Sequence, residues 1–143
     1  MHYRRLGTSN LQVSALCLGT MMFGDQTDQA EAAAIVAHAH AAGVNFIDTA
    51  DVYTHGASES MVGALIQPHR HDWVLATKLG NAMSKRPNEG QYSRIWMLRE
   101  VDASLRRLQT DHIDILYLHR DFPGIDLEEP LRALDDLVRA GKI

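Results

Sequence analysis

Residues 44–53 read Val-Asn-Phe-Ile-Asp-Thr-Ala-Asp-Val-Tyr, an apolar run that passes abruptly into acidic and hydroxyl-bearing residues. Three other apolar runs, at residues 15–19, 73–77 and 113–118, also lack regular polar alternation. Continuous apolar runs of this length are typical of strands buried on both faces, as in a parallel sheet. The sequence therefore predicts four buried parallel strands.

Stretches with helical spacing follow each of these strands. Asp28 with Glu31 three residues later resembles a capping box at a helix start, and Ser58 is expected to cap the next helix. The third helix is expected from about residue 93 to 109, with Ile95 on its apolar face. The fourth has an apolar stripe at Leu127, Leu131, Leu134 and Val138. A hairpin at residues 1–14 precedes four βα units at residues 15–143, so we expect an α/β fold with a parallel sheet.

Two architectures fit this alternation, an open doubly wound sheet and a (β/α)8 TIM barrel. The glycine-rich GxGxxG fingerprint of the doubly wound dinucleotide-binding fold is absent from the sequence. Each predicted strand ends instead in polar residues: Gly19-Thr20, Asp48, Lys78 and His119. In a barrel, the carboxyl ends of all strands meet at one mouth, where active sites lie. We therefore expect a barrel, of which this chain forms about half.

Asp48, Lys78 and His119 would converge at that mouth, with Tyr53 on the loop after the second strand. A tyrosine is a poor acid at neutral pH because its reference pKa is about 10, and a neighbouring ammonium stabilises the phenolate. Lys78 could supply the ammonium and Asp48 could keep it charged, while His119 could donate a hydrogen bond to a carbonyl. A phenol beside a carbonyl suits a reduction that adds hydride to carbon and a proton to oxygen.

These residues and their surroundings resemble the aldo-keto reductase superfamily. The resemblance rests on Asp-Thr-Ala-Asp-Val-Tyr at 48–53, Gly-Ala-Ser-Glu at 56–59, Thr77-Lys78 and Leu118-His119. It extends over essentially the whole chain and is closest to the group that includes bacterial reductases and potassium-channel β subunits. The hairpin resembles the plug at the base of those barrels.

The resemblance implies that Tyr53 is the general acid, that Lys78 and Asp48 tune it, and that His119 orients the carbonyl. It implies NADPH as cofactor, with Gly19, Thr20, Met21 and Asp48 beside the nicotinamide ribose. Relatives often carry an aromatic residue at the position of Met21. The resemblance implies a reductase of aldehydes or ketones; the alternative is a non-enzymatic NADPH-binding regulatory subunit, although channel subunits carry asparagine where this chain has His119.

Composition excludes several other classes of function. The net charge of −4 argues against a nucleic-acid binder that neutralises phosphates, and no apolar run is long enough to cross a membrane. The single cysteine, Cys17, is expected in a buried strand as an inert thiol, and it fits a reducing, cytoplasmic location. His38 and His40 are two apart on a helix and point to different faces, so we expect no metal site. A metal-dependent barrel hydrolase is a weaker third hypothesis, since only one histidine lies at a strand end.

The length of 143 residues is about half of what a complete barrel needs. We therefore expect the C-terminal half of the barrel, which in this family holds the adenosine phosphate of NADPH, to be absent from this chain. Alone, the chain is expected to be inactive and to self-associate through its exposed half-barrel edges.

Overall fold

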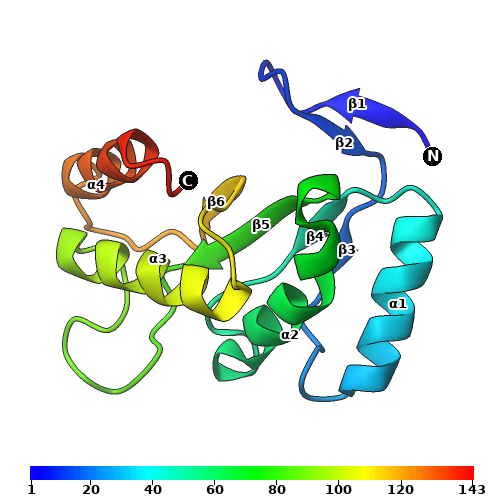
Figure 1. The fold of residues 1–143 in the computed structure, drawn as a ribbon. Coiled ribbons are helices and arrows are strands. Elements are labelled where there is room, and N and C mark those ends of the chain that lie inside the picture. The colour runs from blue at the N-terminus through cyan, green and yellow to red at the C-terminus, as the bar shows by residue number, and fades with distance from the viewer.

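The computed structural model describes residues 1–143 and contains two sheets (Figure 1). The first is an antiparallel hairpin of β1 (Tyr3–Arg5) and β2 (Gln12–Ser14). The second is a four-stranded parallel sheet in the order β3-β4-β5-β6. Its strands are β3 (Leu18–Gly19), β4 (Phe46–Asp48), β5 (Val74–Leu79) and β6 (Ile115–Leu118). Spatial order follows chain order, as expected for successive βα units.

Four α-helices wrap around one side of the sheet (Figure 1). They are α1 (Gln29–Ala41), α2 (Ala57–Ile66), α3 (Arg94–Leu108) and α4 (Glu128–Arg139). Two 3-10 helices, η1 (Tyr53–Gly56) and η2 (Gln67–Asp72), flank α2. The predicted cap of α1 is confirmed, because the Glu31 N–H donates to Asp28 Oδ1 at 2.9 Å. No helix has the length and apolar character needed to span a bilayer.

The core lies between the sheet and the helices. Val62 and Ile66 of α2, Leu75 of β5 and Met97 of α3 are fully buried. Helices α2 and α3 approach closely at Gly63, where a Cβ atom would lie 2.5 Å from the Leu108 carbonyl group. These contacts fix the position of β5, which carries Lys78, one of the predicted site residues.

The first predicted strand is shorter and more exposed than expected. Only Leu18–Gly19 pairs with β4, and Ala15, Leu16 and Cys17 are exposed. The prediction of Cys17 in a buried strand was therefore wrong. The reason is that β3 lies at the edge of the sheet, where it pairs with β4 on one side only.

The apolar stripes of the later helices were also partly misassigned. Leu127, Leu131 and Val138 are 56–58% exposed, and α4 instead buries Pro130, Ala133 and Leu137. Ile95 at the start of α3 is 61% exposed. Helix α4 packs against α3, and its Leu131 and Val138 lie on the flank that faces away from that contact. Periodicity identified the helix but not which apolar flank it buries.

Candidate active site

The carboxyl edge of the parallel sheet gathers the four predicted catalytic side chains. Asp48 is the last residue of β4, Lys78 lies one residue before the end of β5, and His119 follows β6. Parallel pairing keeps these ends level, since Asp48 faces Ala76 and Lys78 faces Tyr117 in register. The backbone N–H of His119 donates to the Leu79 carbonyl at 2.9 Å, which extends the pairing to that residue.

Lys78 is the centre of the site. Its ammonium donates to Asp48 Oδ2 at 2.5 Å, to the Thr49 carbonyl at 2.8 Å and to the Tyr53 hydroxyl at 3.2 Å. A lysine has three donor protons, and these three acceptors match them. The side chains of Lys78 and Asp48 are 17% and 23% exposed, so the pair is shielded but still reaches the surface.

Tyr53 lies between Lys78 and His119. The rings of Tyr53 and His119 meet edge to face, with centroids 5.8 Å apart and planes at 87°. Burial, together with the positive charge of Lys78, lowers the pKa of His119 below its ordinary value. The imidazole is therefore neutral at neutral pH, and its Nδ1 atom is buried without a hydrogen-bond partner. A neutral imidazole carries one N–H donor and one acceptor nitrogen.

A strained turn presents Tyr53 to this site. Thr54 and His55 directly after it adopt left-handed backbone conformations, with φ of 49° and 52°, and Gly56 follows with φ of 89°. Positive φ is unfavourable for a β-branched residue such as Thr54, and strain of this kind clusters at functional sites. The Thr54 hydroxyl donates to the Phe23 carbonyl at 3.2 Å, which ties the turn to the loop after β3.

A buried set of three hydroxyl groups supports the other side of the site. Ser58 Oγ lies 3.1 Å from Thr20 Oγ1 and 3.0 Å from Thr49 Oγ1. The prediction that Ser58 caps α2 was wrong, because Gly56 occupies the cap position and the Ser58 side chain points into this cluster. Thr20 Oγ1 donates to the Asp48 carbonyl at 3.0 Å and so helps to place Asp48.

Two open hollows meet at Asp48 and Gly19. One, of about 530 Å³, is lined by Thr20, Met21 and Tyr53 among others. The other, of about 540 Å³, is lined by Lys78, His119 and Cys17 among others. Gly19 has open space where a Cβ atom would be, so an extended ligand could pass over it between the two hollows. The predicted cofactor residues thus lie beside the predicted catalytic ones.

Cys17 borders the second hollow as an exposed free thiol. Desolvation by the surrounding chain and repulsion from the Asp48 carboxylate raise its pKa to about 11. It is therefore a protonated and weakly nucleophilic thiol at neutral pH. Nowhere in residues 1–143 do three or more His, Cys, Asp or Glu side chains form a group that could hold a metal ion.

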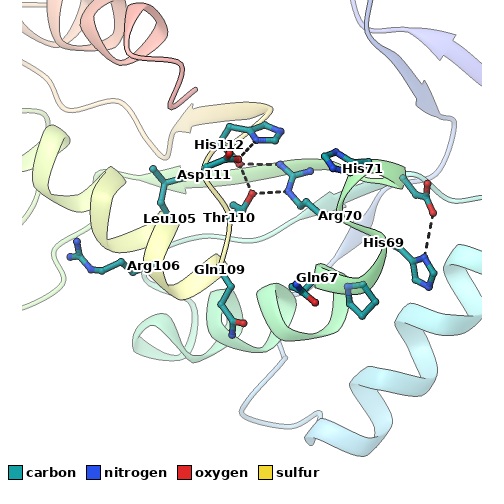
Figure 2. Close-up of a pocket in the computed structure, with 12 residues that line it drawn as sticks. Gln67, His69, Arg70, His71, Leu105, Arg106, Gln109, Thr110, Asp111 and His112 are labelled. Atoms are coloured by element: carbon teal, nitrogen blue, oxygen red, sulfur yellow. Dashed lines mark hydrogen bonds and ion pairs between the residues drawn. The ribbon is translucent and has the colours of Figure 1, made fainter.

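A larger polar hollow of about 800 Å³ lies at the opposite, amino edge of the sheet (Figure 2). Residues 69–71 belong to η2, and the Arg70 side chain is largely buried. Its guanidinium donates to Asp114 Oδ2 at 2.8 Å and to the carbonyls of His112 and Trp73. Through these hydrogen bonds Arg70 joins the segments that lead into β5 and β6, which is a structural role.

Sequence reasoning missed the Thr49 carbonyl, the third acceptor for Lys78. No side-chain pattern encodes a backbone carbonyl as a site group. The signal available was the position of Thr49 directly after a strand that ends in Asp48, where the chain turns and its backbone groups leave the sheet.

The chain is similar to known proteins over nearly its whole length. Residues 15–143 match the model of the Aldo/keto reductase family. The chain is 40% identical to the uncharacterized oxidoreductase YqkF of Bacillus subtilis, over 100% of this chain and 47% of that protein. It is 37% identical to a probable voltage-gated potassium channel subunit beta of Arabidopsis thaliana, over 99% of this chain and 44% of the subunit. It is also 38% identical to the versiconal hemiacetal acetate reductase of Aspergillus parasiticus, over 99% of this chain and 49% of the reductase.

Among solved structures, the chain resembles aldo-keto reductase AKR11C1 from Bacillus halodurans in its holo form, with a TM-score of 0.90 and 38% identity. The match covers 99% of this chain and 47% of that structure. The chain thus spans about half the length of the relatives it matches, and its four βα units correspond to half of a TIM barrel. On sequence and structure together, the chain belongs to the aldo/keto reductase family.

Proposed function

We propose that this chain carries the catalytic half of an NADPH-dependent reductase that converts aldehydes or ketones to alcohols. The observation that supports this most directly is the set of three bonds from the Lys78 ammonium to Asp48, Thr49 and Tyr53. The set places a phenol, a cation and an anion in contact at the open edge of the sheet. A carbonyl reduction needs such a proton donor next to the carbonyl oxygen.

NADPH, when bound, would supply a hydride to the carbonyl carbon. Gly19, Thr20, Met21 and Asp48 fit its nicotinamide ribose because they line a hollow that borders Tyr53. Tyr53 would donate its hydroxyl proton to the carbonyl oxygen as the hydride arrives, and Lys78 would stabilise the phenolate that remains. Asp48 accepts a hydrogen bond from Lys78 at 2.5 Å and so holds that side chain in place, and the neutral His119 would donate a hydrogen bond that orients the carbonyl.

We also propose that residues 1–143 on their own associate and lack turnover. Strands β3 and β6 are open edges of the sheet, and open edges are templates for pairing with another chain. The exposed Leu16, Leu127 and Leu131 add apolar surface for such contacts. The free thiol of Cys17 fits a reducing location, and we propose the cytoplasm.

The decisive experiment completes the barrel. Residues 1–143 are joined to the C-terminal half of the Bacillus halodurans relative, which overlays this chain with a TM-score of 0.90. NADPH oxidation is then followed with a panel of small aldehydes and ketones. We expect turnover in the chimera, no turnover in residues 1–143 alone, and loss of turnover but not of NADPH binding in the Tyr53→Phe chimera.

Each other outcome has a definite reading. Turnover that survives Tyr53→Phe would remove Tyr53 as the proton donor. NADPH binding without turnover on any carbonyl would favour a regulatory subunit, the class to which the Arabidopsis thaliana relative is assigned by its name. A chimera that oxidises no NADPH but hydrolyses substrates only when a metal ion is added would be a hydrolase instead.

A further inference from the structure

A second cluster of charged groups lies on the other face of the sheet from the candidate site. Glu59 of α2 is fully buried, and its carboxylate accepts from Thr77 Oγ1 and from Arg107 Nε, each at 2.6 Å. Arg107 of α3 also donates to Glu100 at 2.5 Å and to Ser104 at 3.0 Å. We call Asp51, Glu59, Thr77, Glu100 and Arg107 the outer cluster.

The outer cluster is costly to bury. Arg107 pairs with two carboxylates, Glu59 and Glu100, while both oxygens of a third carboxyl group, Asp51, are buried without a hydrogen-bond partner. Burial, followed by repulsion from Glu100 and Glu59, raises the pKa of Asp51 to about 8, although Arg107 partly offsets this. Well-packed apolar side chains are often at least as stable as a buried ion pair. Stability alone therefore gives no reason for this cluster.

The cluster contacts the candidate site at three points. Thr77 precedes Lys78 on β5, and successive side chains of a strand point to opposite faces. A bond that fixes Thr77 on the outer face therefore fixes the direction of Lys78 on the inner face. The Asp51 N–H donates to the Lys78 carbonyl at 3.0 Å, which links the cluster to the same residue through the backbone.

The third contact is between Arg107 and the strained turn that follows Tyr53. A Cβ atom at Gly56 would lie 2.7 Å from Arg107 Cδ, so the arginine side chain packs directly against this turn. Gly56 has φ of 89°, and it follows two residues that are also left-handed. A turn in this conformation persists only where its surroundings hold it.

From these contacts we propose that Thr77, Glu59 and Arg107 are positioning residues. From the outer face of the sheet, they hold Lys78 and the turn after Tyr53 in the positions that allow Lys78 to hydrogen-bond to the Tyr53 hydroxyl. Glu59 joins α2 to β5 through Thr77 and joins α2 to α3 through Arg107. The Arg107 side chain also packs against Gly56 in the turn after Tyr53. The distance of 3.2 Å between Lys78 Nζ and the Tyr53 hydroxyl thus depends on groups that touch neither side chain.

The proposal rests on the proposed function for its catalytic meaning, but its first test does not need activity. The chimera with the completed barrel is labelled with a heavy carbon isotope in its tyrosine rings and studied by nuclear magnetic resonance. The Tyr53 signal is assigned by its loss in Tyr53→Phe. Thr77→Val keeps the side-chain shape without the hydroxyl, and Thr77→Ser keeps the hydroxyl as the matched control.

We expect Thr77→Val to move the Tyr53 ring signal by more than its linewidth, and Thr77→Ser to leave it in place. The signal of Tyr92, whose hydroxyl donates to the Arg120 carbonyl, should stay fixed in both variants. Arg107→Lys, which keeps the charge but loses the planar fork, should move the Tyr53 signal in the same direction. It provides the same test if Thr77→Val does not fold.

A purely structural role would give a different result. Thr77→Val and Arg107→Lys would then lower stability in urea while the Tyr53 signal of the folded fraction stayed at its wild-type position. That result would overturn the proposal. If the Tyr53 signal moves but the chimera shows no turnover, the positioning role stands and the proposed reductase function is rejected.

The chimera adds a kinetic readout. Thr77→Val should lower kcat about tenfold with little change in KM, because a misplaced proton donor affects the transition state rather than binding. Thr77→Ser should restore kcat. An equal loss of kcat in Thr77→Ser and Thr77→Val would contradict a role for the hydroxyl group.

Discussion

Two ion pairs, Lys78–Asp48 and Arg107–Glu59, lie on opposite faces of the same sheet and have opposite character. Lys78 and Asp48 are 17% and 23% exposed, and the ammonium reaches a tyrosine hydroxyl that borders an open hollow. Arg107 is 22% exposed but Glu59 is 0% exposed, and the Glu59 carboxylate accepts from Thr77 and Arg107. The inner pair lies beside a tyrosine hydroxyl at an open hollow, whereas the carboxylate of the outer pair is enclosed by protein groups.

From this difference we expect the inner pair to act in the reaction and the outer pair to stabilise the fold. A charged pair at an open edge can stabilise charge that develops during a reaction. An ion pair with a buried, hydrogen-bonded carboxylate holds secondary-structure elements together, and removing its cation leaves a buried charge without a partner. Removing one cation should therefore affect activity on the inner face and stability on the outer face.

The largest expected effect is on turnover through the inner pair. Lys78→Met in the chimera should lower kcat about 10²–10⁴-fold, since the tyrosine loses the ammonium that stabilises its phenolate. Initial rates of NADPH oxidation measure this change. Lys142→Met is the matched control, because Lys142 makes a comparable bond to Asp102 at 2.6 Å far from the site. Equal losses in both variants would show that the effect is not specific to the lysine at the candidate site.

The next effect is on stability through the outer pair. Arg107→Met should lower the free energy of unfolding by about 3–5 kcal/mol, because Glu59 and Glu100 then remain buried without a cation. Urea unfolding followed by circular dichroism measures this loss. A loss below about 1 kcal/mol would show that the outer pair behaves as a surface pair.

A third effect is a dependence of stability on pH in the outer cluster. Asp51 has its pKa raised from 3.8 to about 8 in the folded chain, by burial first and by Glu100 next. Between about pH 4 and about pH 8 the unfolded chain has ionised this group while the folded chain keeps it protonated. The free energy of unfolding therefore falls by up to about 1.4 kcal/mol per pH unit as pH rises through that window.

Asp51→Asn cannot ionise and should remove this fall. Urea unfolding of both proteins at several pH values within the window tests it. The variant should match the wild type near the acidic end and exceed it in stability near the alkaline end. Parallel curves for the two proteins would mean that Asp51 is ionised in the fold.

The smallest effect concerns an exposed pair of similar chemistry. Arg132 and Glu128 on α4 are 76% and 65% exposed and lie one helical turn apart. Arg132→Gln should change the free energy of unfolding by about 0.5 kcal/mol or less, because solvent screens such pairs. The same urea experiment measures it. A loss comparable with that of Arg107→Met would show that burial does not control the strength of these pairs.

Much of the fold and of the site could be predicted from local patterns. Apolar runs at 44–47 and 73–77 identified two strands, and the spacing after Asp28 identified the start of a helix. Polar residues directly after buried strands identified Asp48, Lys78 and His119, because parallel strands bring their carboxyl ends to one edge. These predictions concern residues whose environment follows from their position along one element.

Other predictions failed where the environment depends on a neighbouring element. Leu127 and Leu131 have helical spacing, yet they are exposed because α4 has a packing partner on one flank only. Cys17 lies in an apolar run, yet it is exposed because β3 is an edge strand. Ser58 has the chemistry of a helix cap, yet its hydroxyl is enclosed by Thr20 and Thr49.

By itself the sequence determined the alternation of strands and helices and the residue types at the strand ends. Both depend on local spacing and on the solubility of side chains. Only the tertiary structure decided that Lys78 donates to three acceptors, at Asp48, Thr49 and Tyr53, and that Arg107 packs against the turn after Tyr53. Those contacts join residues 25 to 51 positions apart, and no local pattern specifies where such distant groups meet.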